Sequence, residues 1–338
     1  MNTISSQNPF FETYSTLHST VPFDKIKTGD YVPAIREGIR RQNAEIEAII
    51  RNPEVPTFAN TVLAYEKSGE MLHRVSTVFG NLLSAETDDD LQELAKEIMP
   101  MMSEHENNIS LNEELFARIK AVYEQQDKET LSPEQHKLLE DIYNGFVRNG
   151  ANLLGEDKEK YRALCKELSL LTLQFSENNL KETNDYKLVI TDKSQLAGLP
   201  ESAVEAAAET AGEKGVEGWV FTLQAPSYGP FLTYADSRDL RRELYMAYNT
   251  KCTHDNASNN LEIVKKLANV RMEIAQLLGY DNFAEYNLQE RMAQNSESVY
   301  KLLDQLLEAY TPTAKQEYAE VQALARQAEG EDFVQIGR

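Results

Sequence analysis

The adjacent residues His105 and Glu106 begin a pattern that can bind zinc. In a helical H-E-x-x-H motif, two histidines one turn apart hold the metal, and the glutamate acts as a general base. Here the chain continues Asn107, Asn108, Ile109, so an apolar residue stands where the second histidine is needed. The motif is incomplete at this position. None of the five histidines has another histidine four residues later: His18, His73, His105, His136 and His254.

Two further groups of residues have metal-binding chemistry without a metal-binding pattern. His136 and Glu140 lie one helical turn apart and could coordinate a metal or act as acid and base. We favour a surface i,i+4 pair, because such pairs are ordinary on helices. The run Asp88 to Asp90 lacks the spaced oxygens and the glycine of a calcium loop. We interpret it as the acidic first turn of a helix, which the helix dipole favours.

The remaining candidates are a thiol and two tyrosines. Cys165 lies beside the apolar stripe of a predicted helix, with no histidine near it in sequence. Free cysteine usually packs as a small hydrophobe, and we favour that interpretation over a catalytic thiol. Tyr228 and Tyr234 could hydrogen-bond a bound peptide, but packing would explain at least one of them equally well.

A cluster of three arginines follows at Arg238, Arg241 and Arg242. It could clamp a substrate carboxylate. Salt bridges within the chain are the interpretation we favour, because the chain has 55 acidic residues. The residues alone therefore assign no catalytic and no metal-binding position, and the substrate-binding residues stay unknown.

Composition limits the classes of protein to which this chain can belong. Its 338 residues are 41% hydrophobic, which is enough for a substantial core. Lys and Arg number 34 against 55 Asp and Glu, and the formal charge of -21 disfavours nucleic acid as a partner. Two cysteines are too few for a disulfide scaffold. No apolar run approaches the roughly 20 residues that cross a bilayer. We expect no membrane partner and a cytoplasmic location, or a periplasmic one if a signal peptide was removed.

Apolar residues recur every three or four positions over most of the chain, which predicts a mainly α protein. The helix over 161–175 should be among the longest and most buried, and Pro312 should kink or split the last one. Ser132, Pro133 and Gln135 form a capping box with a favourable proline. We expect helices at residues 35–49, 62–82, 91–102, 112–125, 133–148, 161–175, 201–211, 237–251, 260–280, 283–293 and 296–327.

A short β excursion interrupts this helical pattern. Residues 186–191, "YKLVIT", predict a strand. "WVFTL" and "FLTYA" flank the turn residues "APSYGP", which predicts a β-hairpin over 219–235 with Trp219 as a buried anchor. We therefore expect three regions, a helical one at 1–183, a small β-containing insertion at 184–235, and a second helical one at 236–338. No fixed repeat period emerges, which disfavours a solenoid.

Several longer segments resemble one family of peptidases. Residues 21–69, "VPFDKIKTGDYVPAIREGIRRQNAEIEAIIRNPEVPTFANTVLAYEKSG", and 111–124, "LNEELFARIKAVYE", resemble the N-terminal region of bacterial peptidyl-dipeptidases, also called dipeptidyl carboxypeptidases. Residues 225–248, "APSYGPFLTYADSRDLRRELYMAY", and 273–293, "EIAQLLGYDNFAEYNLQERMA", resemble segments shared across the thimet oligopeptidase family, which includes oligopeptidase A and neurolysin. The resemblance implies an elongated, mainly helical zinc peptidase whose two halves face each other across a deep channel. It also implies that the predicted hairpin belongs to a channel wall.

One departure from the family pattern decides how far the resemblance extends. Family members carry an H-E-x-x-H helix and a third glutamate ligand, and this sequence contains neither. None of the family's zinc ligands, general base or tyrosines is therefore carried over. The resemblance implies an N-terminal fragment of a peptidyl-dipeptidase that binds no zinc by itself, with oligopeptides and a missing catalytic half as partners. The alternative is a helical module that binds peptides or a protein without hydrolysis.

Overall fold

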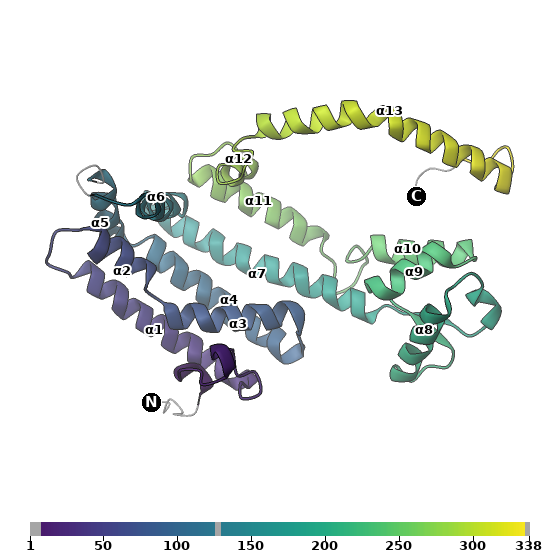
Figure 1. Cartoon of the computed structure of the whole chain (residues 1–338), viewed down its shortest axis with the longest axis horizontal. Coiled ribbons are helices and arrows are strands. Elements are labelled where there is room, and N and C mark those ends of the chain that lie inside the picture. Colours follow the sequence, from purple (N-terminus) through teal and green to yellow (C-terminus); the bar gives the residue numbers. More distant parts are fainter. Residues whose placement is uncertain (1–7, 126–129, 335–338) are drawn as a thin grey trace. The chain divides into compact units, whose positions relative to one another are not determined.

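The computed structural model describes residues 8–125 and 130–334, and these form a mainly α protein, as the sequence predicted (Figure 1). The chain divides into two compact units, residues 1–274 and 275–338, which are described separately below. In the first unit the elements are α1 Tyr31–Ile50, α2 Leu63–Glu66, α3 Glu70–Ala85, α4 Asp89–Ser110, α5 Glu113–Glu124, α6 Pro133–Arg148, α7 Gly155–Asp185, β1 Leu188–Ile190, α8 Glu201–Glu213, β2 Trp219–Phe221, α9 Ala225–Tyr234, α10 Arg238–Asn249 and most of α11 Leu261–Leu277. The second unit holds the end of α11, α12 Phe283–Leu288 and α13 Ser296–Glu329.

Two apolar cores hold α1 to α6 together. In the first, Phe10 and Phe79 both pack against Tyr31, with both ring centroids 5.3 Å from that of Tyr31. This core joins α1, α3 and the first half of α4. The second core joins the end of α1 to α5 and α6, and Phe116 stacks on Phe146 inside it. Burial on this scale is the main source of stability for such helices.

Two glycines shape this part of the fold. Gly38 allows α1 to approach α3 closely, and Gly69 ends the segment that precedes α3. A Cβ at Gly38 would lie 2.9 Å from the Cα of Leu72. Gly69 has a φ of +74°, and a Cβ there would clash with the side chain of Gln42. The single long helix predicted over 62–82 is therefore wrong. The left-handed backbone at Gly69 separates α2 from α3, because an α-helix cannot pass through that conformation.

Side-chain caps fix where several helices begin. Ser132 and Gln135 form the predicted capping box at the start of α6, which confirms that helix at its predicted bounds. The Asp88 carboxylate accepts a hydrogen bond from the Leu91 N–H at 2.8 Å, so the acidic run is the start of α4, as interpreted from the sequence. The helix is longer than predicted and continues through Pro100 to Ser110.

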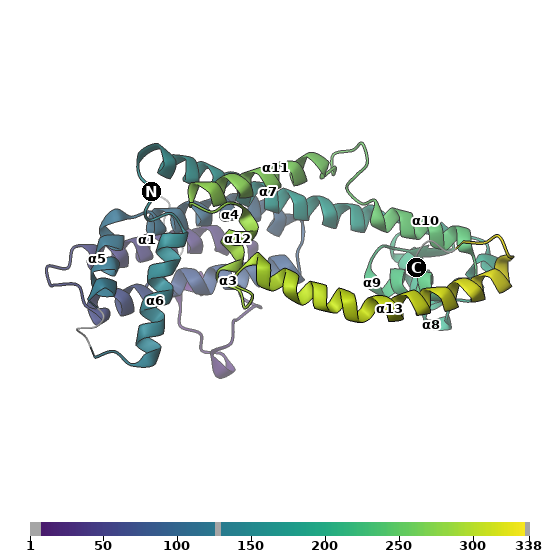
Figure 2. The same ribbon diagram turned by 90° about the horizontal axis from the view of Figure 1, so that it is seen from above.

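Helix α7 connects the helical part of the first unit to its β-containing part. It is 31 residues long, which confirms that it is among the longest helices although it extends beyond the predicted 161–175, and it packs beside α4 (Figure 2). The predicted burial is wrong, because only Tyr161, Leu164 and Leu171 are buried. Phe175, which belongs to the same stripe, is 38% exposed.

The β excursion exists, but its strands pair differently from the prediction. Strands β1 and β2 are antiparallel, with Val189 opposite Val220. The hairpin predicted over 219–235 is wrong, because residues 225–234 form α9. Pro226 lies in its first turn, where proline favours a helix. The helical turn points Phe231 at Phe221, with ring centroids 4.6 Å apart, so packing overrides the strand propensity of "FLTYA".

The second unit contains little apart from α13. Helix α12 ends at Leu288, earlier than predicted. Helix α13 continues through Pro312 without a split and is bowed in Figures 1 and 2. Among the described residues, no helix has a stretch both long and apolar enough to cross a bilayer.

The β-containing core generates a first prediction. Phe221 is 1% exposed, whereas Trp219 is only partly buried and is not the fully buried anchor predicted from the sequence. We expect Phe221→Ala to lower the free energy of unfolding by about 3 to 5 kcal/mol, because it empties a packed core site. Trp219→Ala serves as the comparison and should cost less. Chemical denaturation measures both, and an equal or larger loss for Trp219→Ala would contradict this description of the core.

A buried carboxylate in α1 generates a second prediction. Glu37 accepts hydrogen bonds from Arg40 at 2.7 and 2.8 Å and from Arg41 at 2.8 Å. The two Arg40 bonds, together with the one from Arg41, lower the pKa of Glu37 to about 2. A lowered pKa adds stability above the ordinary value near 4.5, and this stability is lost as the pH falls toward 2.

We therefore expect Glu37→Gln to lower the free energy of unfolding at pH 7 by about 1 to 2 kcal/mol. This loss is smaller than the pKa shift alone would imply, because water screens the charges of the exposed arginines. The difference from the unsubstituted chain should shrink as the pH falls below 4.5. Glu47→Gln is the matched control, since Glu47 lies on the same helix and pairs with Arg51, the exposed residue that directly follows it. Unfolding measured from pH 7 to pH 3 tests this, and a constant difference across that range would refute it.

Candidate functional site

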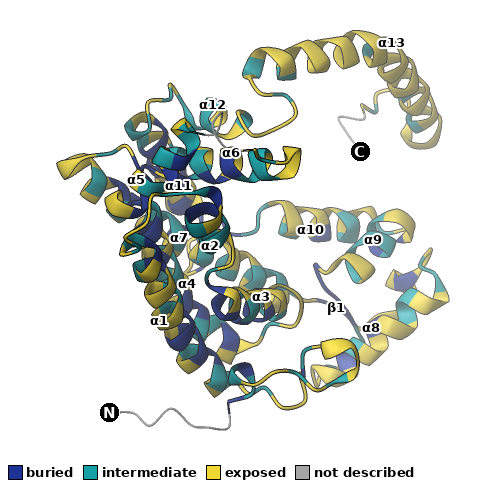
Figure 3. Ribbon diagram, turned by 60° about the vertical axis from the view of Figure 1, so that its left-hand side comes forward, coloured by how far each residue is buried: buried dark blue, intermediate teal, exposed yellow. Residues whose placement is uncertain are grey.

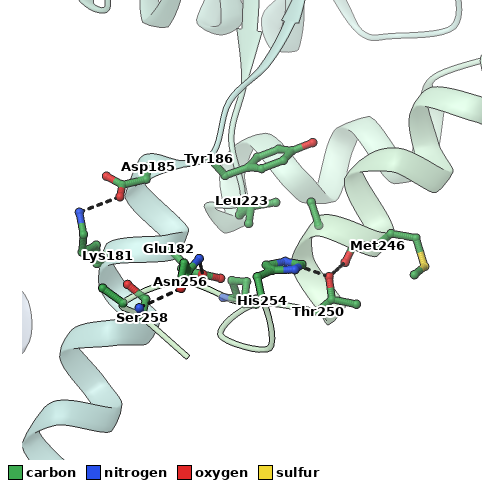
Figure 4. A pocket seen from close by; sticks show the side chains of 13 residues that line it. Lys181, Glu182, Asp185, Tyr186, Leu223, Met246, Thr250, His254, Asn256 and Ser258 are labelled. Carbon is green, nitrogen blue, oxygen red and sulfur yellow. Dashed lines mark hydrogen bonds and ion pairs between the residues drawn. The ribbon is translucent and has the colours of Figure 1, made fainter. Parts of the chain in front are cut away.

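A pocket of about 620 Å³ lies where the end of α7 meets α10 and residues 250–258 (Figure 4). We call it the α7–α10 pocket. Its inner wall includes Leu223, which is 2% exposed, and Ala247. Polar side chains from α7 and from residues 250–258 line it as well, among them His254 and Ser258. A concave apolar surface with a few polar groups is the usual form of a small-molecule or side-chain site.

The carboxylate of Glu182 holds residues 250–258 against α7. One oxygen accepts a hydrogen bond from the Cys252 N–H at 2.6 Å, and the other accepts one from the Asn256 side chain at 2.6 Å. Cys252 has a φ of 59°, which is uncommon for a residue other than glycine. The two hydrogen bonds offset the cost of this conformation and fix the wall of the pocket in one shape.

A buried asparagine holds the same segment from its other end. Asn260 donates from its side chain to the Phe175 carbonyl at 3.0 Å and accepts from the Asn178 side chain at 2.8 Å. Its backbone N–H donates to the Cys252 carbonyl at 2.8 Å. The α7–α10 pocket is therefore built on a rigid framework, which suits binding. Neither Glu182 nor Asn260 is among the candidates predicted from the sequence, because each resembles an ordinary polar residue until the fold brings residues about 70 to 85 positions apart into contact.

The candidates His105, Glu106 and Cys165 line a second and larger cavity, of about 1230 Å³. Its walls come from α1, α2, α3, α4 and α7, and we call it the α4–α7 cavity. Nothing in the sequence groups Cys165 with the other two, because it lies about 60 residues away on α7. Packing of α7 beside α4 brings them to one cavity.

His105 is 3% exposed and has one hydrogen bond. Its Nε2 lies 2.8 Å from Oε1 of Gln42, and its Nδ1 has no partner among the described residues. Burial lowers the pKa of His105, which keeps the ring neutral. Because the amide oxygen of Gln42 accepts a proton, Nε2 carries the hydrogen and Nδ1 is left as an acceptor.

Burial acts in the opposite direction on the two acidic groups of this cavity. Removal from water raises the pKa of Glu106 and that of the Cys165 thiol. The Cys165 thiol also interacts with Tyr161 and Asn107, which partly offset the effect. A raised pKa keeps a thiol protonated and weakly nucleophilic, which supports the packing interpretation of Cys165.

The other candidates are dispersed. Glu140 lies on the surface of α6 and is 3.9 Å from Lys137, so the ion pair it makes is with Lys137 rather than the predicted i,i+4 pair with His136. Tyr228 stacks on Tyr248 with ring centroids 4.4 Å apart, so packing accounts for it, whereas Tyr234 is 54% exposed.

The arginine cluster has a use that the sequence did not indicate. Arg241 donates from its guanidinium to the backbone carbonyls of Ala235 and Asp236, the second at 3.0 Å. These carbonyls directly follow α9, so Arg241 stabilises the end of that helix rather than an ion pair with a carboxylate. Across residues 8–125 and 130–334, no group of three His, Cys, Asp or Glu side chains could hold a metal ion.

Comparison with known proteins finds a family and several individual proteins that this chain resembles. Residues 231–336 match the family described as Peptidase family M3. The dipeptidyl carboxypeptidase of Escherichia coli (strain K12) is 36% identical over 329 residues, which cover 97% of this chain and 48% of that protein. The dipeptidyl carboxypeptidase of Salmonella typhimurium is 34% identical, over 94% of this chain and 47% of its own length.

Oligopeptidase A of Haemophilus influenzae is 30% identical, over 94% of this chain and 46% of its own length. The chain therefore spans about half the length of the curated relatives it matches. These matches confirm the resemblance inferred from the sequence, and they extend it over nearly all of the chain: this protein is similar to the peptidases of family M3.

Proposed function

We propose that this chain is the channel-wall portion of a zinc-dependent peptidyl-dipeptidase, an enzyme that removes dipeptides from the C-terminal ends of oligopeptides. The zinc ion and the catalytic groups would belong to a further part of the polypeptide. The similarity to two dipeptidyl carboxypeptidases over about half their length supports this proposal. We place the enzyme in the cytoplasm, or in the periplasm if a signal peptide was removed.

The observation that carries the proposal is the uncovered apolar face of α13. Large apolar residues of this helix are exposed along its whole length, including Leu307 at 67% and Leu324 at 67% (Figure 3). None of the described residues 276–334 is buried, so the second unit contains nothing that covers this face. Exposed apolar surface of this extent marks a site of contact with another chain or segment.

The width of the face indicates what kind of partner covers it. Leu302, Leu306, Tyr310, Leu303 and Leu307 spread over about 140° of the helix at 100° per residue. A stripe wider than about 100° is typical of a helix in a globular core, whereas a two-stranded coiled coil uses a narrower seam. We therefore favour the remainder of a larger polypeptide over a second copy of this chain as the partner. The helix lies inside the stretch that matches family M3, which supports the same conclusion.

The residues of this chain do not fit a zinc ion. The sequence has no H-E-x-x-H motif, and the part of the chain described by the structure offers no cluster of three metal-binding side chains. Hydrolysis of an amide at neutral pH needs an activated water. In the proposal, the missing part supplies it, and the regions at 1–183, 184–235 and 236–338 supply a wall against which an oligopeptide is bound. The start of the family match at residue 231 supports a boundary near 235.

We expect the 338-residue chain to bind no stoichiometric zinc and to cleave no peptide. A polypeptide in which the chain is joined to a catalytic half should release C-terminal dipeptides and should lose this activity to a chelator. Metal analysis and a dipeptide-release assay on both proteins test this. Chelator-sensitive cleavage by the short chain would refute the proposal, and a joined protein that binds peptides without cutting them would favour the non-catalytic binding module.

The face of α13 gives a matched prediction. Leu303→Gln combined with Leu307→Gln should change the stability of the 338-residue chain by less than about 0.5 kcal/mol, because both side chains are exposed, and should reduce its self-association and binding of a hydrophobic dye. In the joined protein the same pair should cost about 2 kcal/mol or more, because both leucines become buried.

Lys301→Gln, on the opposite side of α13, is the control and should have little effect in either protein. Denaturation and sedimentation measure the outcome. A loss of about 2 kcal/mol already in the short chain would show that this chain covers the face itself, and would remove the main support for a missing partner.

A further inference from the structure

We propose that the α7–α10 pocket binds an uncharged aromatic group that carries a hydroxyl, namely a phenol such as the side chain of a tyrosine in a peptide. The site goes beyond the proposed peptidase function and does not depend on it. It follows from three features of the lining: charged side chains that already have partners, walls with apolar and aromatic surface, and one enclosed hydroxyl that has no partner within the described chain.

The charged side chains at the pocket disfavour a charged ligand. Lys181 pairs with Asp185, with its Nζ 2.8 Å from the carboxylate. Both oxygens of Glu182 accept hydrogen bonds from N–H groups of the chain, as described above. The Nζ of Lys251 donates to the hydroxyl of Thr183 at 2.9 Å. Two bases therefore balance two acids, and an ion that entered the pocket would lose hydration without finding an unpartnered charge of opposite sign.

The walls present apolar and aromatic surface to a ligand. Tyr186 lines the pocket, but its hydroxyl is buried and is turned away from Ser258 in Figure 4, so Tyr186 presents its ring. Met246 is 43% exposed and adds a thioether to the same lining. Aromatic rings pack favourably against another ring and against methionine sulfur, beyond the gain from burial alone. An aromatic group is therefore favoured over an aliphatic group of similar size.

Ser258 supplies the enclosed hydroxyl. The residue is 5% exposed and lines the pocket. Its backbone N–H donates to Oδ1 of Asn256 at 2.8 Å, whereas its hydroxyl has no hydrogen bond with a described residue. Asn256 is in turn held by Glu182, so the hydroxyl has a fixed place. A buried polar group without a partner is costly, and a ligand hydroxyl can donate to Ser258 or accept from it.

Calorimetric titration of the 338-residue chain with N-acetyl-tyrosinamide and N-acetyl-phenylalaninamide tests the proposal, because the two ligands differ only in the hydroxyl. We expect the tyrosine amide to bind with a Kd of about 1 mM or tighter and the phenylalanine amide to bind about threefold to tenfold more weakly. Ser258→Ala should remove this difference and leave binding of the phenylalanine amide unchanged. Ser84→Ala, at an exposed serine of α3 outside the pocket, should preserve the difference.

Two further measurements show whether the ligand occupies the pocket. Ala257 is exposed and lines the pocket, so Ala257→Leu should fill part of it and weaken the binding of both amides about threefold or more. With 13C-methyl-labelled methionine, and with Met246→Leu to assign the signal, the aromatic ring of either amide should shift the methyl resonance of Met246. N-acetyl-leucinamide should bind more weakly and cause no comparable shift.

The source of the phenol is distinguished by p-cresol, which has the same ring and hydroxyl without the peptide groups. Binding of p-cresol as tight as that of the tyrosine amide indicates a free phenol, and weaker binding indicates a peptide side chain. Either source supports the site if the affinity depends on Ser258. Equal affinities for the tyrosine and phenylalanine amides, an unchanged difference in Ser258→Ala, equal binding of N-acetyl-leucinamide, or no binding with no shift at Met246 would overturn it.

Discussion

Apolar surface has to be buried, and this one constraint separates the part of the chain that can be stable alone from the part that cannot. Residues 8–274 contain three apolar clusters with fully buried side chains, such as Ile35, Leu139 and Phe231. Helix α13 has an apolar face of comparable composition and buries none of it within residues 275–334. Its 34 residues span about 51 Å at 1.5 Å per residue, which is a large surface to leave in water. The need to cover this face underlies our view that the chain functions as part of a larger protein.

Helix α7 determines where both cavities form. Its first half packs beside α4 and closes the α4–α7 cavity, and its last turns provide Glu182, which holds residues 250–258 at the α7–α10 pocket. A helix that is buried along only part of its length leaves polar side chains free to face such cavities. The low burial of α7 and the presence of two pockets along it therefore have the same physical cause.

The sequence predicted the features that depend on local chemistry. Periodicity located nearly every long helix, and the cap at Ser132 fixed the start of α6 to the residue. The errors arose where tertiary contacts decide. The residues of α9 have strand propensity but form a helix because Phe231 packs on Phe221. Gly69 divides a segment for which hydrophobic spacing alone predicts one continuous helix.

The sites were less predictable than the fold. His105 and Glu106 drew attention as part of an incomplete zinc motif, and Cys165 as an isolated thiol. Their common cavity depends on how α7 packs on α4, which no spacing in the sequence reveals. The hydrogen bond from His105 to Gln42 joins residues 63 positions apart, and the bond from Glu182 to Cys252 joins residues 70 apart. Only long-range packing brings such groups together.

Hydrogen exchange of the 338-residue chain, resolved to peptides and compared between α4 and α13, tests the central claim most directly. Helix α4 has buried side chains from Leu91 to Ile109, so its amides should exchange slowly. Helix α13 has no buried residue, so its amides should exchange much faster in the isolated chain and become protected when the chain is joined to a catalytic half. Protection of α13 equal to that of α4 in a monomeric 338-residue chain would contradict the account, because it would show that the helix needs no further partner.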